Sequence, residues 1–144
     1  MAKKWQRVEE GIIQYLKDWW GQDFRRQRVV VGPDGEELEL EFDAVSEDMQ
    51  VFAEVKSMSR PQHAREMQLA LDDIRKLQAV RASRKLLFLV DPLFYQVFCR
   101  KHQKDLISWK RQGIEIVSPF ELVGYLEGLE LPGGAEPTSS EAGE

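Results

Sequence analysis

The sequence LELEFDAVSEDMQVFAEVK, residues 38–56, decides both the fold and the chemistry expected of this chain. From residue 36 to 45, apolar and polar or acidic residues alternate strictly, which is typical of a β-strand with one buried face. Residues 51–56 form a second, mostly apolar strand that contains one Glu and one Lys. Polar residues 46–50 connect the two as a turn. The segment therefore predicts two consecutive strands, with charged side chains placed where burial is expected.

Asp43 on the first strand and Glu54 on the second are expected to lie opposite each other. The short loop between the strands sets a register that pairs residue 43 with residue 54, with Cβ atoms about 4.5–5.5 Å apart. Two carboxylates at that separation repel, so one must take up a proton unless a cation lies between them. Lys56 is two residues after Glu54 and projects from the same face. The pattern predicts two acids and one amine around a bound cation.

These three side chains suit phosphodiester hydrolysis. Carboxylates bind hard divalent cations such as Mg²⁺ or Mn²⁺. The bound metal polarises a phosphoryl oxygen and lowers the pKa of an attacking water, and a nearby ammonium stabilises the developing charge. The alternative is a solvated strand face, on which Lys56 lies opposite Glu41 in a surface ion pair worth under about 1 kcal/mol.

Hydrophobic periodicity on either side of this segment predicts the rest of the fold. Helices are expected at residues 5–20, 93–111 and 119–128, and a long helix is expected after Pro61 up to about residue 82. Strands are expected at residues 24–31, 36–45, 51–56, 86–90 and 114–117. The resulting order, α-β-β-β-α-β-α-β-α, predicts an α/β fold with a mixed β-sheet flanked by helices.

The 144 residues correspond to one domain, at residues 1–130. The segment 131–144, rich in Gly, Pro, Ser and Glu, is expected to be a disordered acidic tail. The single cysteine, Cys99, excludes an intrachain disulfide, and no signal peptide is recognisable, so a cytoplasmic location is expected. No apolar run approaches the roughly 18 residues of a membrane helix, so no membrane partner is expected.

The net charge of −5 is unevenly distributed. Residues 29–59 carry nine acids and one Lys, whereas residues 1–28 carry seven basic residues and four acids, and residues 60–111 carry twelve and five. An acidic centre between basic segments suits a cation site beneath a polyanion track. Ordinary mixed surface charge is the alternative.

Asp43 followed by Glu54-Val55-Lys56, on a β-hairpin behind an N-terminal helix, resembles the PD-(D/E)XK nuclease superfamily. The element order over residues 8–90 follows the core of that superfamily. EFDAV and VFAEVKS look particularly like archaeal Holliday-junction resolvases and small uncharacterised bacterial nuclease-like proteins. Phe42 stands where the Pro that names the motif would be, at a position that varies widely. The resemblance implies a restriction-endonuclease-like fold and a Mg²⁺-dependent endonuclease acting on structured or damaged DNA, with RNA left open.

The resemblance also implies roles for individual residues. Asp43 and Glu54 would bind the metal, helped by the Val55 carbonyl, and Lys56 would orient the water or stabilise charge. Glu9 in the first helix would bind a second metal or its water, with Glu10 as the alternative. Side chains that follow the site strand or precede it are candidates for nucleic-acid contacts, with a solvated surface as the alternative for each: Arg60, Arg65 and Gln68, and Arg25, Arg26 and Arg28.

Two functions of other classes stay open. A domain with this fold can lack activity and serve as a non-catalytic nucleic-acid-binding or assembly module. Trp19 and Trp20, on the amphipathic first helix, can form a contact between two copies of the chain, and a homodimer is expected. Dimerisation is compatible with nuclease activity because a duplex offers two scissile strands.

Overall fold

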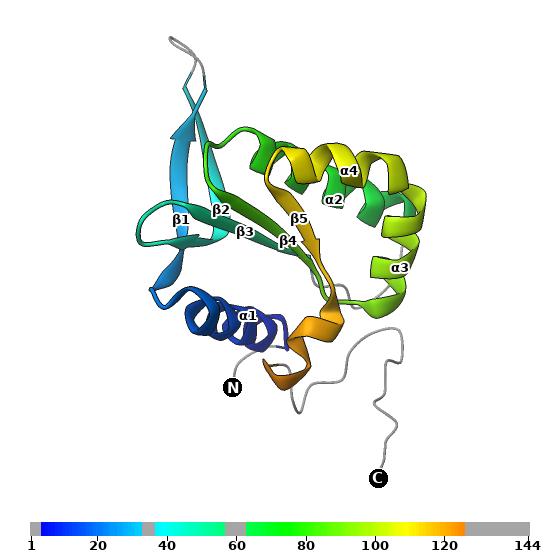
Figure 1. The fold of residues 1–144 in the computed structure, drawn as a ribbon, viewed down its shortest axis with the longest axis horizontal. Helices are drawn as coiled ribbons and strands as arrows, with labels where there is room; N and C mark the ends of the chain where they lie inside the picture. The colour runs from blue at the N-terminus through cyan, green and yellow to red at the C-terminus, as the bar shows by residue number, and fades with distance from the viewer. Residues whose placement is uncertain (1–3, 33–36, 57–62, 126–144) are drawn as a thin grey trace.

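The chain forms a single mixed β-sheet with helices on both faces (Figure 1), in a computed structural model that describes residues 4–32, 37–56 and 63–125. In chain order its elements are α1 (Lys4–Trp20), β1 (Phe24–Val31), β2 (Leu38–Ser46), β3 (Val51–Lys56), α2 (His63–Gln78), β4 (Arg84–Leu89), α3 (Pro92–Lys101), α4 (Gln103–Arg111), β5 (Ile114–Val117) and the 3₁₀ helix η1 (Pro119–Tyr125). The predicted α/β class and the predicted order of elements as far as β4 are confirmed.

The five strands follow one another across the sheet in the order β1-β2-β3-β4-β5. The first three pair antiparallel, whereas β3, β4 and β5 pair parallel. Parallel neighbours need a crossover connection, and α2 and the α3–α4 pair provide the two crossovers. The sheet therefore has an antiparallel part, built from hairpins, and a parallel part, built from strand–helix–strand units.

Apolar side chains form one cluster on each face of the sheet. The cluster on the α1 and η1 face includes Val8, Ile12, Leu16, Phe88 and Leu122. The cluster on the face of α2, α3 and α4 includes Phe42, Phe52, Ile74, Leu87 and Phe98. Successive β3 residues alternate between the two clusters, with Phe52 on the α2 side and Ala53 on the α1 side. Glu54 and Lys56 follow Phe52 in two-residue steps, and so they face α2.

The alternation predicted for residues 36–45 is interrupted at Asp43. The register between β1 and β2 shifts by one residue, so that Asp43 and Ala44 both lie opposite Arg26. Two residues against one define a β-bulge, a feature that re-aims side chains. Phe42 consequently packs on the α2 side and Ala44 on the α1 side. The prediction that these two residues share a face is wrong, because the extra residue shifts the pleat.

The helices differ from prediction at three places. The helix predicted at 93–111 is divided at His102, whose backbone leaves the helical conformation and whose ring packs against Phe98 and Trp109. The predicted helix 119–128 is the 3₁₀ helix η1. α2 ends at Gln78, before the predicted end near residue 82, because hydrogen bonds from Ala79 and Val80 to residues three positions earlier form a tighter turn there.

Three other predictions concern the surface and the ends of the chain. No helix in the described ranges is long and apolar enough to cross a membrane. Trp19 is 66% exposed, whereas Trp20 is half-buried and packs against Phe24. The homodimer expected through this helix stays a prediction, and the tail at 131–144 lies outside the described residues.

Candidate active site

The candidate site lies where β2 and β3 diverge. Their ladder pairs Val45 with Phe52 and Ala44 with Ala53. One more step along the same register brings Asp43 opposite Glu54, as the loop length predicted.

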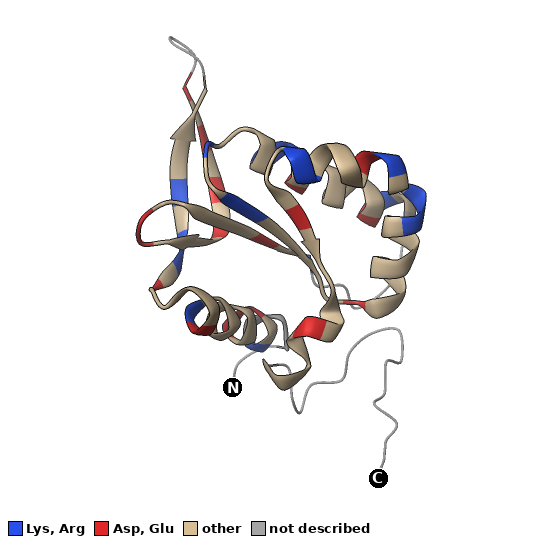
Figure 2. Ribbon diagram, in the orientation of Figure 1, with Lys and Arg blue, Asp and Glu red and all other residues tan. Residues whose placement is uncertain are grey.

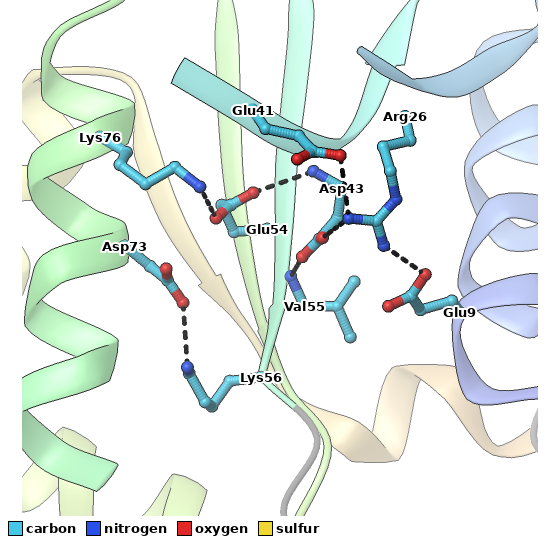
Figure 3. A network of polar contacts seen from close by, with 9 residues as sticks. All are labelled: Glu9, Arg26, Glu41, Asp43, Glu54, Val55, Lys56, Asp73 and Lys76. Carbon is cyan, nitrogen blue, oxygen red and sulfur yellow. Dashed lines mark hydrogen bonds and ion pairs between the residues drawn. The ribbon is translucent and has the colours of Figure 1, made fainter. Parts of the chain in front are cut away.

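Beyond this ladder, the side-chain carboxylates of Asp43 and Glu54, in place of main-chain carbonyls, accept the hydrogen bonds between the two strands. Glu54 Oε1 accepts a hydrogen bond from the Asp43 amide at 2.9 Å. Asp43 Oδ2 accepts one from the Val55 amide at 2.8 Å. Figure 3 shows these two bonds crossing between the strands. Each acid therefore holds the backbone of the neighbouring strand, and the local fold fixes where both carboxylates lie.

On one side, Glu54 and Lys56 meet two charged residues of α2. Lys76 Nζ lies 2.6 Å from Glu54 Oε2, and Lys56 Nζ lies 3.5 Å from Asp73 Oδ2. Lys76 also lies over the Phe42 ring, 5.1 Å from its centroid. These four charged residues, Glu54, Lys56, Asp73 and Lys76, are called the α2 group below. In the α2 group each acid has its own ammonium partner.

Burial perturbs the two acids of the α2 group. Glu54 is only 3% exposed, and desolvation together with the negative charge of Asp43 raises its pKa to about 8, although Lys76 opposes the shift. Desolvation also raises the pKa of Asp73, against the lowering effect of Lys56. Because the charged form of Glu54 is disfavoured in this environment, the carboxylate gains strongly from any cation placed against it.

On the other side, Asp43 meets a guanidinium that three acids share. Arg26 Nη2 lies 2.8 Å from Glu9 Oε1, while Nη1 lies 3.3 Å from Asp43 Oδ1 and 3.4 Å from Glu41 Oε2. Burial alone would lower the pKa of Arg26, but the hydrogen bond that Arg26 donates to Glu9 and the charges of Glu9 and Asp43 raise it. These four residues, Glu9, Arg26, Glu41 and Asp43, are called the α1 group below. Figure 3 shows the α1 group and the α2 group on opposite sides of the strand pair.

An open cavity of about 770 Å³ adjoins the α1 group. It lies between α1 and β1, and its charged lining comprises Glu9, Glu10, Lys17, Arg25, Arg26 and Asp43. The cavity gives solvent and solutes access to the Asp43 side of the candidate site.

The structure brings most of the predicted site residues into one network. Asp43, Glu54, Val55 and Lys56 lie along the diverging strands, and Glu9 joins them through Arg26. The solvated-face alternative paired Lys56 with Glu41. Instead, Lys56 pairs with Asp73 and Glu41 pairs with Arg26.

Four other candidates are not assigned to this network. Arg65 and Gln68 are exposed on α2, where Gln68 donates a hydrogen bond to Asp72 at 3.0 Å. Glu10 is exposed and lines the cavity. Arg60 lies outside the described residues.

Basic residues lie at both edges of the sheet (Figure 2). At the β1 edge, beside the candidate site, they face acids of β2, as in the pair of Arg28 and Glu39 at 3.6 Å. At the other edge, α4 packs on β5 and carries exposed basic residues with the end of α3: Arg100, Lys101, Lys104, Lys110 and Arg111. The exposed basic residues of α4 and of the end of α3 are therefore separated from those of β1 by the width of the sheet.

Four residues of the site are not assigned to it by the sequence pattern. Arg26 is indicated only as a candidate for phosphate contacts, and Glu41 only as a surface partner of Lys56. Asp73 and Lys76 are not singled out. One signal for Asp73 exists, because it falls between Ala70 and Leu77 at helical spacing, in the stripe of α2 that packs on the sheet. A carboxylate in such a stripe indicates a buried polar contact.

The donor set fits a divalent cation, because Asp43, Glu54 and the Val55 carbonyl supply hard oxygen ligands. Each oxygen of the two carboxylates already contacts a main-chain amide or a cationic side chain. In the described ranges, no three Asp, Glu, His or Cys side chains are arranged as a preformed metal-binding group. A metal at this position would take over contacts now made by Arg26 and Lys76.

Comparisons of the chain with protein-family models, with curated proteins and with solved structures found no significant match. The resemblance to PD-(D/E)XK nucleases therefore stays a prediction from the sequence.

Proposed function

We propose that the protein is a metal-dependent endonuclease that hydrolyses phosphodiester bonds in DNA, including structured or damaged DNA. The observation that carries the proposal is the buried Glu54, held against Asp43 at the divergence of two strands with Lys56 on the same strand. Two adjacent acids with one amine are the side chains that metal-assisted phosphodiester hydrolysis requires.

Each residue has a distinct role in this proposal. Asp43, Glu54 and the Val55 carbonyl would hold Mg²⁺ or Mn²⁺. When bound, the metal supplies Lewis-acid polarisation of the phosphoryl oxygen and a water of lowered pKa. Lys56 would place its ammonium near the charge that develops on the phosphate. Asp73 positions Lys56, and Lys76 positions Glu54, through the contacts already present.

Cleavage of defined DNA substrates tests the proposal. Purified protein with Mg²⁺ or Mn²⁺ is incubated with supercoiled plasmid, linear duplex and a four-way junction, and with the same junction made of RNA. Nicking of closed plasmid is expected from an endonuclease. Glu54→Gln should lower the rate by about 10²–10³-fold, because it removes a charged metal ligand and keeps the side-chain shape.

Glu115→Gln on β5 is the matched control, because it removes one strand carboxylate far from the site by sheet order. Its cleavage rate should equal that of the wild type. Circular dichroism and thermal unfolding check that both variants fold. Wild-type activity in Glu54→Gln would reject the assignment.

A non-catalytic nucleic-acid-binding or assembly module is the second candidate. The observation in its favour is that every oxygen of Asp43 and Glu54 has a partner within the chain. Titration calorimetry separates the two candidates. A nuclease should bind Mn²⁺, and Asp43→Asn should abolish this binding. A non-catalytic module should bind DNA equally well with and without metal.

A further inference from the structure

Arg26 is the single cationic side chain of the α1 group. Arg26 lies on β1, and its guanidinium contacts three acids, Glu9 on α1 and Glu41 and Asp43 on β2. The β-bulge causes this convergence, because it sets Asp43 and Ala44 opposite Arg26 alone. One positive charge thus faces three carboxylates, and the group as a whole keeps a negative charge that attracts cations.

We propose that Arg26 is an exchangeable counter-ion of the site: it neutralises Asp43 without metal, gives up Asp43 when a divalent cation binds, and then contacts a phosphate of the nucleic acid. The inference rests on the proposed function, which it extends to a residue outside the predicted metal ligands. Arg26 competes with the metal for Asp43. Once the metal has displaced Arg26 from Asp43, Arg26 binds a phosphate of the substrate.

The three contacts of Arg26 differ in a way that permits this exchange. The contact with Glu9 is short, at 2.8 Å, whereas those with Asp43 and Glu41 are 3.3 Å and 3.4 Å. Charge-assisted N–H···O bonds are usually about 2.7–2.9 Å long, so the latter two are weak. The Arg26 side chain is 45% exposed, so water solvates the guanidinium when it leaves Asp43, and the incoming metal replaces it as the partner of that carboxylate. Arg26 can therefore leave Asp43 while it stays paired with Glu9.

The cavity between α1 and β1 offers a destination for the displaced guanidinium. Arg26 lines that cavity together with Arg25 and Lys17. A guanidinium matches two oxygens of a phosphate in a bidentate manner, and a bound divalent cation would offset the three acids of the lining, Glu9, Glu10 and Asp43. A phosphate of the DNA backbone in the cavity would therefore lie within reach of Arg26 and beside the Asp43 carboxylate.

Manganese binding tests the counter-ion role without relying on catalysis. Titration calorimetry with MnCl₂ compares the wild type, Arg26→Gln and Arg84→Gln. Arg84 is the matched control because it is also on a strand, is also paired with a carboxylate and is 47% exposed. Arg26→Gln should bind Mn²⁺ about tenfold more tightly, since a positive charge beside a ligand is removed. Arg84→Gln should bind within about twofold of the wild type, because distant exposed charges are screened.

Three results of this titration would overturn the counter-ion role. They are an unchanged or weaker Mn²⁺ affinity in Arg26→Gln, an equal gain in Arg84→Gln, and no Mn²⁺ binding by any of the proteins. Arg26→Lys keeps the charge without the bidentate fork. The Mn²⁺ affinity of Arg26→Lys should lie between those of the wild type and Arg26→Gln. A gain in affinity as large as that of Arg26→Gln would also contradict the role.

DNA affinity tests the phosphate contact. Fluorescence anisotropy with a labelled duplex and CaCl₂ is measured in a Lys56→Ala background, which lacks the amine proposed to stabilise charge. Addition of Arg26→Gln should weaken binding about fivefold, whereas addition of Arg84→Gln should leave it nearly unchanged. Equal affinities with and without Arg26 would overturn the phosphate contact.

The two proposals fail in different ways. A tenfold gain in Mn²⁺ affinity without DNA cleavage by the wild type rejects the nuclease and keeps the counter-ion. Cleavage that depends on Glu54, with no change in Mn²⁺ affinity for Arg26→Gln, rejects the counter-ion and keeps the nuclease.

Discussion

The α1 group and the α2 group hold the two sides of one strand pair, and they neutralise their acids in different ways. In the α1 group, three carboxylates share the half-exposed guanidinium of Arg26. In the α2 group, Glu54 and Asp73 each have their own ammonium, and the side chains of both acids are largely buried. The same kinds of charge therefore occur at different depths on the two sides of β2 and β3.

This difference in depth separates contacts that stabilise the fold from contacts that can be exchanged. A buried charge that loses its partner has no water to replace it, so its removal is costly. A half-exposed charge is solvated when its partner leaves, so the cost is small. We therefore expect the α2 group to contribute stability and to orient the site, and the α1 group to respond to metal and solutes.

The largest effect is expected from removal of the ammonium that faces Glu54. Lys76→Met leaves the buried carboxylate without its cation and should lower the free energy of unfolding by about 2 kcal/mol. The loss stays below that of a fully buried pair, because Glu54 can take up a proton when its pKa is already near 8. Urea denaturation at pH 7 measures the effect.

Arg75→Met is the control for Lys76→Met. Arg75 is the preceding residue of α2, and its side chain is 68% exposed. It should change the free energy of unfolding by less than about 0.5 kcal/mol. Equal losses of unfolding free energy in the two variants would show that the contact between Lys76 and Glu54 does not stabilise the fold.

The stability of the protein is also expected to depend on pH through Glu54. The pKa of Glu54 is raised from 4.5 to about 8 in the folded protein, so between these values the native state keeps a proton that the unfolded state releases. Stability from this group is complete below pH 4.5 and is lost as the pH rises through 8. The free energy of unfolding should therefore decline over this range in the wild type, and the decline should be absent or reduced in Glu54→Gln. Parallel profiles for the two proteins would contradict the burial of a perturbed Glu54.

The pair of Lys56 and Asp73 should contribute about 1 kcal/mol of coupling energy, since both side chains are mostly buried but lie 3.5 Å apart. A double-mutant cycle with Lys56→Met and Asp73→Asn measures this value from denaturant unfolding. Additive effects of the two substitutions would show that the contact does not hold Lys56 in place.

Local patterns in the sequence predict the strand pair and the register of its acids. The alternation before the turn and the apolar run after it set the two strands, and the short loop alone sets Asp43 opposite Glu54. Burial of Glu54 follows from its position in an apolar strand that is covered on both faces. These features depend on residues close together in the chain, which is why they can be derived from it.

The partners of those acids depend on packing between distant segments. The bulge at Asp43 leaves the alternation of apolar and acidic residues intact, and it becomes visible only when β1 pairs with β2. The positions of Asp73 and Lys76 over β3 depend on how the crossover helix lies on the sheet. A sequence pattern indicates that a buried Glu54 needs a cation, but the choice of Lys76 follows from the tertiary fold.

The smallest effect is expected in the α1 group. A double-mutant cycle of Arg26→Gln and Glu9→Gln should give a coupling energy of less than about 0.5 kcal/mol in low salt, because the guanidinium is half-exposed and Glu9 is partly exposed. The coupling should fall towards zero in 1 M NaCl, where the Debye length is about 3 Å. The coupling between Lys56 and Asp73 should persist under the same conditions, because buried pairs are screened less. A salt-resistant coupling of Arg26 with Glu9 as large as that of Lys56 with Asp73 would mean that the two sides of the strand pair are held equally firmly.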